Sequence, residues 1–129
     1  MHTNNTLVHL ECNQNNYQGL FLTNNAKIAL IKIINKTLNK QNIILNIKKS
    51  GCLGYKYYIK LSHITDKYIM FKNNNIDLYI QKKNILFIDG TIIDYQIKEF
   101  SKKFIFYNKN IQNFCGCGES FNIKYSKEN

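Results

Sequence analysis

The stretch that decides the fold is NIILNIKKSGCLGYKYYIKL, residues 42–61. Its first part, residues 42–48, alternates apolar and polar side chains in the way that is typical of a half-buried strand. Residues 55–61 are aromatic and β-branched, and they indicate a second strand that returns beside the first. The stretch therefore predicts a hairpin with Cys52 in its turn. The glycines on either side of that turn let the backbone approach a bulky group without side-chain collision.

One helix is predicted before this hairpin and several short strands after it. Thr23 is a suitable N-cap for an amphipathic helix of about four turns. Its apolar residues fall at helical spacing: Ala26, Ala29, Leu30, Ile33, Ile34 and Leu38. Short apolar runs that read as strands follow at residues 68–71, 76–80, 85–88, 92–97 and 104–107, separated by turn signals. The pattern predicts a mainly β fold with α (α+β), a compact sandwich-like domain preceded by an N-terminal amphipathic helix.

The length of 129 residues corresponds to about one domain. Residues 1–16 are polar and asparagine-rich, and we expect them to form a flexible N-terminal arm that contains Cys12. The domain is expected over residues 17–125, with a short tail at 126–129. The sequence has neither an apolar run long enough to cross a membrane nor a targeting pattern at its start. These features predict a soluble, cytoplasmic protein.

The formal net charge of +10 raises the question of nucleic-acid binding. All 18 basic residues are lysine, so the chain lacks the arginine forks that clamp phosphates and read guanine edges. Lysine, asparagine and isoleucine are all abundant, as mutational pressure toward A/T would produce. We therefore expect no specific nucleic-acid partner.

The chemistry-bearing motif is CGCGESF, residues 115–121. Cys115 and Cys117 are two positions apart, so on an extended segment both thiols lie on one face and can serve one centre. They are too close in sequence for an unstrained disulfide, and nothing marks the chain for an oxidising compartment. Metal ligation or redox chemistry is therefore the working interpretation for these two residues and Cys52.

These motifs together resemble a known family. SGC-x-G about sixty residues before CGCGESF, with FIDGT and D-Y between them, resembles the A-type iron–sulfur carriers, the HesB/IscA/SufA family. The run YQGLFLT and the run FIDGTIIDY are most similar to the SufA branch, and the resemblance covers about residues 17–121. It implies a HesB-like domain of two small mixed β-sheets packed with helices.

The resemblance also implies a function, which is not an enzymatic one. Cys52, Cys115 and Cys117 would bind a [2Fe–2S] or [4Fe–4S] cluster, or iron, in a homodimer or a tetramer. The cluster would come from scaffold donors and pass to acceptor apoproteins. Clusters are normally held by four thiolates, and the motifs of one chain offer three. A second chain, a small thiol or a non-cysteine ligand must therefore complete the site.

Other interpretations of the same residues remain open. A structural zinc site completed by His63 or Glu119 is one, although zinc pairs usually have two to four residues between their cysteines. A thiol–disulfide switch is another, although its usual signature is C-x-x-C. Glu119 is a further candidate iron ligand, or it accepts hydrogen bonds from backbone amides in its turn. Cys12 could be a fourth ligand, but its place in the arm favours an incidental thiol.

Three more charged residues have two interpretations each. Lys56 either faces the cysteine site, where it would favour the Cys52 thiolate, or is a solvated strand residue, which we favour. Asp89 and Asp94 could act as paired carboxylates in acid–base chemistry. A D-G pair before a strand is ordinary turn chemistry, however, and no nucleophile accompanies them. Leu53 also follows Cys52 where relatives carry a small residue, which would narrow a cluster pocket.

Overall fold

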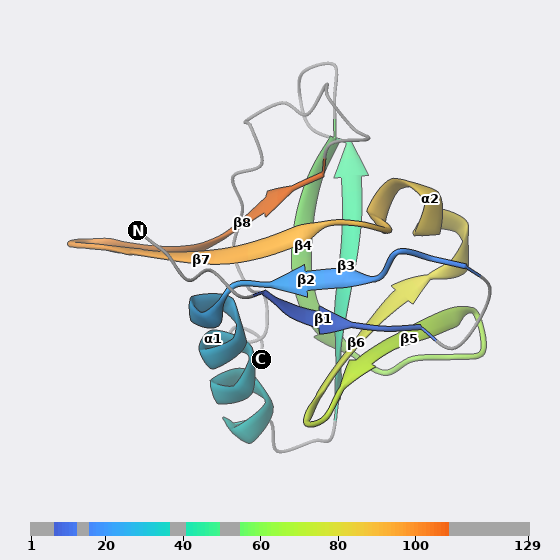
Figure 1. The fold of residues 1–129 in the computed structure, drawn as a ribbon, viewed down its shortest axis with the longest axis horizontal. Coiled ribbons are helices and arrows are strands. Elements are labelled where there is room, and N and C mark those ends of the chain that lie inside the picture. The colour runs from blue at the N-terminus through green and yellow to red at the C-terminus, as the bar shows by residue number, and fades with distance from the viewer. Residues whose placement is uncertain (1–6, 13–15, 37–40, 50–54, 109–129) are drawn as a thin grey trace.

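The computed structural model describes residues 7–12, 16–36, 41–49 and 55–108. They form two four-stranded sheets with one long helix beside them (Figure 1). The first sheet has the order β1-β2-β7-β8, with β1 at Val8–Leu10, β2 at Leu20–Leu22, β7 at Ile92–Lys98 and β8 at Ser101–Tyr107. The second has the order β4-β3-β6-β5, with β3 at Asn42–Lys49, β4 at Tyr55–Ser62, β5 at Tyr68–Asn73 and β6 at Ile76–Gln81.

Both sheets are mixed in the same way. In each, the two central strands are parallel, β2 with β7 and β3 with β6, and the outer strands are antiparallel to their neighbours. Antiparallel neighbours need only tight turns, whereas each parallel pair needs a longer crossover connection. The predicted pair of small mixed sheets is confirmed.

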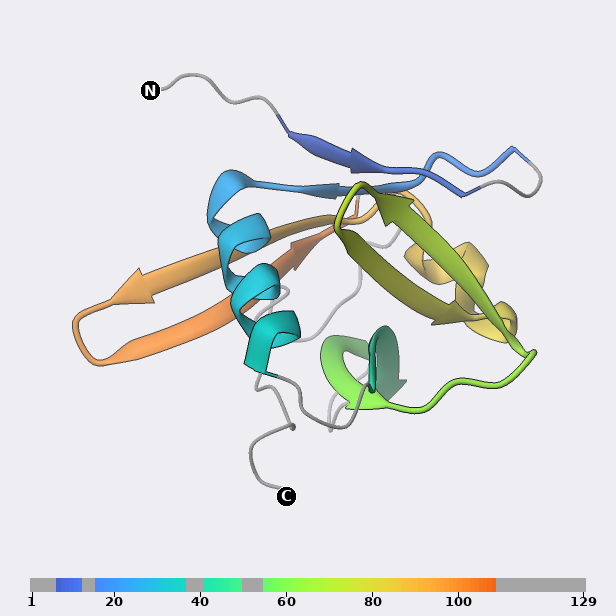
Figure 2. The same cartoon turned by 90° about the horizontal axis from the view of Figure 1, so that it is seen from below.

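The two sheets share one core. Figure 2 shows the arrangement of the sheets and α1 from below. Helix α1, Asn24–Lys36, buries Ala26, Leu30 and Ile33 on one face. Spacings of three and four residues place these side chains on one stripe of the helix. They join buried residues of both sheets, such as Leu78 and Phe104. The side-chain hydroxyl of Thr23 accepts a hydrogen bond from the Ala26 amide at 3.2 Å, which caps the helix.

The N-terminal residues differ from the predicted arm over part of their length. Residues 8–10 form β1, which pairs with β2 in the register Val8↔Leu22 to Leu10↔Leu20. Leu10 is completely buried, and the His9 ring stacks on Phe21 with 4.6 Å between ring centroids. Alternating apolar side chains in only three residues are too short a signal to stand out among the asparagines. Two strands therefore precede α1 in the sequence, and the helix is not the first element of the domain.

The strand predicted over residues 85–88 is wrong. Ile85–Ile88 forms the short helix α2, which follows a 3-10 turn, η1, at Lys82–Asn84. Ile85 and Ile88 are buried, while Leu86 between them is 78% exposed. Buried positions three apart fit a helical turn, and short apolar runs do not distinguish the two structures by periodicity. Among the described residues, no helix is long and apolar enough to cross a membrane.

Candidate functional site

The predicted ligands Cys52, Cys115, Cys117 and Glu119 lie outside the described residues, as does Leu53. The structure does describe the residues from which their two chain segments depart. One is the end of the β3–β4 hairpin, whose last register pair is Lys49↔Tyr55. The other is Asn108, the residue directly after β8. These two departure points define the described part of the candidate site.

Asn108 is held by a group of hydrogen bonds that we call the Asn108 clasp. Its side chain is buried, and its Nδ2 lies 2.9 Å from the hydroxyl oxygen of Thr91 and 3.1 Å from the backbone carbonyl of Asp89. An amide nitrogen has two hydrogens, so these two short contacts can use both. The carbonyls of Phe87 and Ile88 lie slightly farther away, at 3.3 and 3.4 Å. The clasp thus fastens the end of β8 to α2 and to the turn before β7.

Tyr57 brings β4 to the same place. Its side chain is 1% exposed, and its hydroxyl donates a hydrogen bond to the Phe87 carbonyl at 3.2 Å. Burial raises the pKa of Tyr57 to about 12, although hydrogen bonds with Thr91 and Asn108 oppose this shift. The Tyr57 ring also packs on Phe106 of β8, with 5.3 Å between centroids. The structure therefore joins the start of β4, which follows the Cys52 segment, to the end of β8, which precedes the Cys115 segment.

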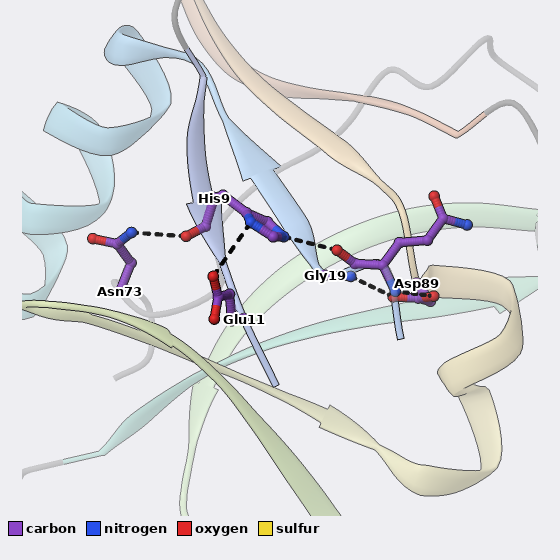
Figure 3. A network of polar contacts seen from close by, with 6 residues as sticks. His9, Glu11, Gly19, Asn73 and Asp89 are labelled. Atoms are coloured by element: carbon purple, nitrogen blue, oxygen red, sulfur yellow. Dashed lines mark hydrogen bonds and ion pairs between the residues drawn. The ribbon is translucent and has the colours of Figure 1, made fainter. Parts of the chain in front are cut away.

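Asp89 and Asp94 have structural roles in this arrangement. Asp89 accepts hydrogen bonds from the backbone amides of Gln18 and Gly19 at 2.9 and 2.8 Å (Figure 3). Asp94 accepts one from the hydroxyl of Thr23 at 2.7 Å, and so orients the cap of α1. Both carboxylates are occupied by connections inside the fold. Asp89 lies in the turn before β7, as the turn interpretation expects, whereas Asp94 lies within β7.

The contacts around His9 extend this network to the second sheet (Figure 3). The His9 ring nitrogen Nε2 lies 2.7 Å from the Gln18 carbonyl, and its Nδ1 lies 3.7 Å from the Glu11 carboxylate. Asn73 of β5 donates to the His9 carbonyl at 2.7 Å. Glu11 and Lys72 exchange two backbone hydrogen bonds of 3.0 Å. The network therefore ties β1 to β5 and closes one edge of the two-sheet structure.

The remaining candidates lie away from the clasp. Lys56 is exposed, and it points to the opposite face of β4 from the buried Tyr57 because neighbouring side chains alternate. His63 follows the far end of β4 and is exposed. Cys12 is half-buried and packs against the core. Within the described ranges, no group of three or more His, Cys, Asp or Glu residues is arranged to hold a metal ion.

Sequence reasoning missed the clasp. Tyr57 resembled any other aromatic strand residue, and Asn108 resembled the many other asparagines in the chain. A usable signal was the position of Asn108, a polar residue directly after the apolar run at residues 104–107 and before the cysteine motif. Such a residue can accept or donate hydrogen bonds where a strand ends.

The fold is a small two-sheet domain in which Tyr57, shortly after the Cys52 segment, and Asn108, directly before the Cys115 segment, meet at α2. The sequence profile described as iron–sulphur cluster biosynthesis matches residues 18–119. The chain belongs to this family, the HesB/IscA family.

Individual proteins agree with this assignment. The chain is 38% identical over 117 residues to an uncharacterized protein of Buchnera aphidicola from Acyrthosiphon pisum, covering 85% of this chain and 90% of that protein. It is 33% identical over 108 residues to the iron–sulfur cluster assembly protein SufA of Escherichia coli, covering 83% of this chain and 88% of SufA.

Two solved structures have the same fold. The crystal structure of Escherichia coli SufA has a TM-score of 0.69 and 31% identity, and the match covers 87% of this chain and 99% of that one. The crystal structure of IscA with the [2Fe–2S] cluster has a TM-score of 0.65 and 19% identity, covering 79% and 96%. At that identity the second comparison shows the fold alone.

Proposed function

We propose that this protein is an A-type carrier or scaffold in iron–sulfur cluster assembly. Cys52, Cys115 and Cys117 bind a [2Fe–2S] or [4Fe–4S] cluster, or iron, and the cluster passes to acceptor apoproteins by exchange of thiolate ligands. Glu119 is a further candidate ligand. The cluster is the cargo of the protein, and no small-molecule substrate is turned over.

The observation that carries the proposal is the meeting of the two departure points at α2. The Tyr57 hydroxyl and the Asn108 amide both lie within 3.3 Å of the Phe87 carbonyl. An extended chain spans at most about 3.3–3.6 Å per residue. Cys52 is three residues from Tyr55, and Cys115 is seven residues from Asn108. Segments of about 10 and about 24 Å are long enough for the thiols to reach one centre.

The ligand count supports a shared site. Three thiolates leave one position of a four-thiolate cluster to be filled from elsewhere. A homodimer, or a tetramer, would supply it from a second chain. Incomplete ligation also favours transfer, because acceptor thiolates can replace the donors one at a time. Reduced thiols are maintained in the cytoplasm, where we place the protein together with its scaffold donors and acceptors.

The zinc alternative becomes weaker in one of its forms. His63 is eight residues after Tyr55, just past the end of β4, and so lies about 26 Å from Tyr55 at the rise of a strand. The three residue steps from Tyr55 to Cys52 span at most about 10 Å, even if they run back beside β4 toward His63. Cys52 and His63 of the same chain therefore cannot both bind one zinc ion. A thiol–disulfide switch between Cys115 and Cys117 would instead show as a two-dalton mass loss on oxidation that a reducing agent reverses.

The proposal is tested by cluster transfer. The protein is reconstituted anaerobically with iron and sulfide, desalted, and mixed with an apoprotein that holds a [2Fe–2S] cluster through four cysteines. We expect the visible circular dichroism of the acceptor to appear at a rate that a mild iron chelator does not change. A rate that collapses in the presence of the chelator would mean that iron is released into solution, and would contradict ligand exchange.

A further inference from the structure

A groove lies between α1 and the β7–β8 hairpin, far from the Asn108 clasp. Its volume is about 420 Å³, and its floor includes Ala29, Ile33 and Tyr95. Both views show the hairpin running past the helix (Figures 1 and 2). Its inner wall is supported by the core, because the Tyr95 ring packs on the buried Phe104 with 4.7 Å between centroids. The floor of the groove is therefore continuous with the core of the described fold.

The two walls of the groove expose branched aliphatic side chains. Ile28 on the helix is 46% exposed, and Ile97 on β7 is 62% exposed. Phe100, in the turn just beyond Ile97, is 96% exposed. Isolated exposed apolar residues are ordinary on protein surfaces. Ile28 and Ile97, however, line one hollow with an apolar floor, which is the arrangement of a surface that buries another chain; Phe100 is not part of that lining.

Lysines border the same groove on both sides. Lys32 and Lys36 are four positions apart and so lie one above the other on α1. Lys102 lies across from them on β8, where it is the register partner of Ile97. The residues that line the groove include no aspartate or glutamate. A groove with apolar walls and lysines along its borders is complementary to a segment that carries apolar side chains between carboxylates.

We propose that this groove binds an acidic amphipathic segment of a partner protein, with an aliphatic side chain between Ile28 and Ile97 and carboxylates beside the lysines. A second copy of this chain fits less well, because it carries 18 lysines against 8 acidic residues. The inference does not depend on cluster binding, so the groove and the cysteines can be tested separately.

The groove also lies at a useful distance from the proposed cluster site. Lys102 and Asn108 are at opposite ends of β8, six residues or about 20 Å apart at the rise of a strand. A partner side chain seated beside Ile97 and Lys102 would therefore lie about 20 Å from the Asn108 clasp, measured along β8.

The test is a titration of the apo protein at about 0.15 M salt, where the Debye length is about 8 Å. The first probe is an 18-residue synthetic helix with leucines on one face and glutamates on the other. The second has the same glutamates with the leucines replaced by glutamines. Isothermal titration calorimetry gives the affinities, and amide chemical shifts in nuclear magnetic resonance spectra locate the contact. We expect binding of the first probe at least about tenfold tighter, a difference of about 1.4 kcal/mol, with shifts at α1 and β7.

Matched variants separate the groove from the general positive charge. The double substitution Lys32→Glu, Lys36→Glu and the single substitution Ile97→Asp should each weaken binding of the first probe about tenfold or more. The control is Lys67→Glu, Lys83→Glu, which makes the same charge change in a hollow lined by Asp66, Lys67, Gln81, Lys82 and Lys83, without aliphatic walls. Equal loss in control and groove variants, or equal affinity of both probes, would overturn the proposal. A change of oligomeric state in Ile97→Asp would overturn it in favour of a second copy.

Discussion

The substitution Asn108→Ala is the most informative single change in the clasp. It removes the two short hydrogen bonds of the buried amide, to the Thr91 hydroxyl at 2.9 Å and to the Asp89 carbonyl at 3.1 Å. A typical hydrogen bond contributes about 0.5–1.5 kcal/mol net to folding. The Thr91 hydroxyl keeps its own bond to the Ile88 carbonyl at 2.6 Å, which limits the loss. We expect the free energy of unfolding to fall by about 2 kcal/mol, or the melting temperature by about 6–8 °C.

The effect on cluster binding distinguishes positioning from stability. If about 1 kcal/mol of the lost hydrogen-bond energy stabilises the cluster-bound form relative to the apo form, Asn108→Ala should lose the cluster to a chelator about fivefold faster than wild type. Asn46→Ala is the matched control, because Asn46 is equally buried and hydrogen-bonds Gln81 of β6 and Asn84 of η1. It should lower the melting temperature by a similar amount and leave the cluster loss rate unchanged. Identical loss rates in the two variants would refute the positioning role of Asn108.

Two further predictions concern stability. The pKa of Tyr57 is raised to about 12 in the folded state and is near 10 in an unfolded chain. The contribution of Tyr57 to the free energy of unfolding is therefore constant below pH 10 and falls as the pH rises from 10 to 12, by on the order of 2 kcal/mol. Urea unfolding at several pH values should show a steeper fall in wild type than in Tyr57→Phe, and equal slopes would contradict this prediction. Gly19→Ala should destabilise more than Gly90→Ala, although both glycines have positive φ. A Cβ at Gly19 would lie 2.5 Å from the Leu10 carbonyl oxygen, whereas one at Gly90 meets only the end of the flexible Gln18 side chain at 3.1 Å. A thermal melt of both variants checks the order, which the reverse ranking would disprove.

Much of the fold could be predicted because its signals are local or belong to the family. The structure has the predicted hairpin at residues 42–61 as β3 and β4. The predicted alternation of a half-buried strand is wrong for β3, because four consecutive residues, Ile43 to Asn46, are buried. The register of those strands follows from burying Leu45 opposite Ile59 on one face. Residues 85–88 failed because four apolar residues fit a helical turn as well as a strand.

The sequence predicts which residues of the site could bind a cluster, but not how the fold brings them together. The ligands expected from the cysteine spacing are Cys52, Cys115 and Cys117, and they remain a prediction. No sequence pattern predicts that Tyr57 and Asn108 both hydrogen-bond the Phe87 carbonyl, because 51 positions separate the two residues. Contacts of that separation arise from how the sheets pack rather than from local preference. The groove at Ile97 was missed for the same reason, since its walls come from α1 and from β7.

The most direct test of the account is the iron and acid-labile sulfide bound per chain after anaerobic reconstitution, measured with the visible spectrum. It should be made for wild type and for Cys52→Ala, Cys115→Ala, Cys117→Ala and Cys12→Ala. We expect a coloured species that contains iron and sulfide, lost in the first three variants and retained in Cys12→Ala. A colourless protein that takes up one zinc ion per chain would contradict it.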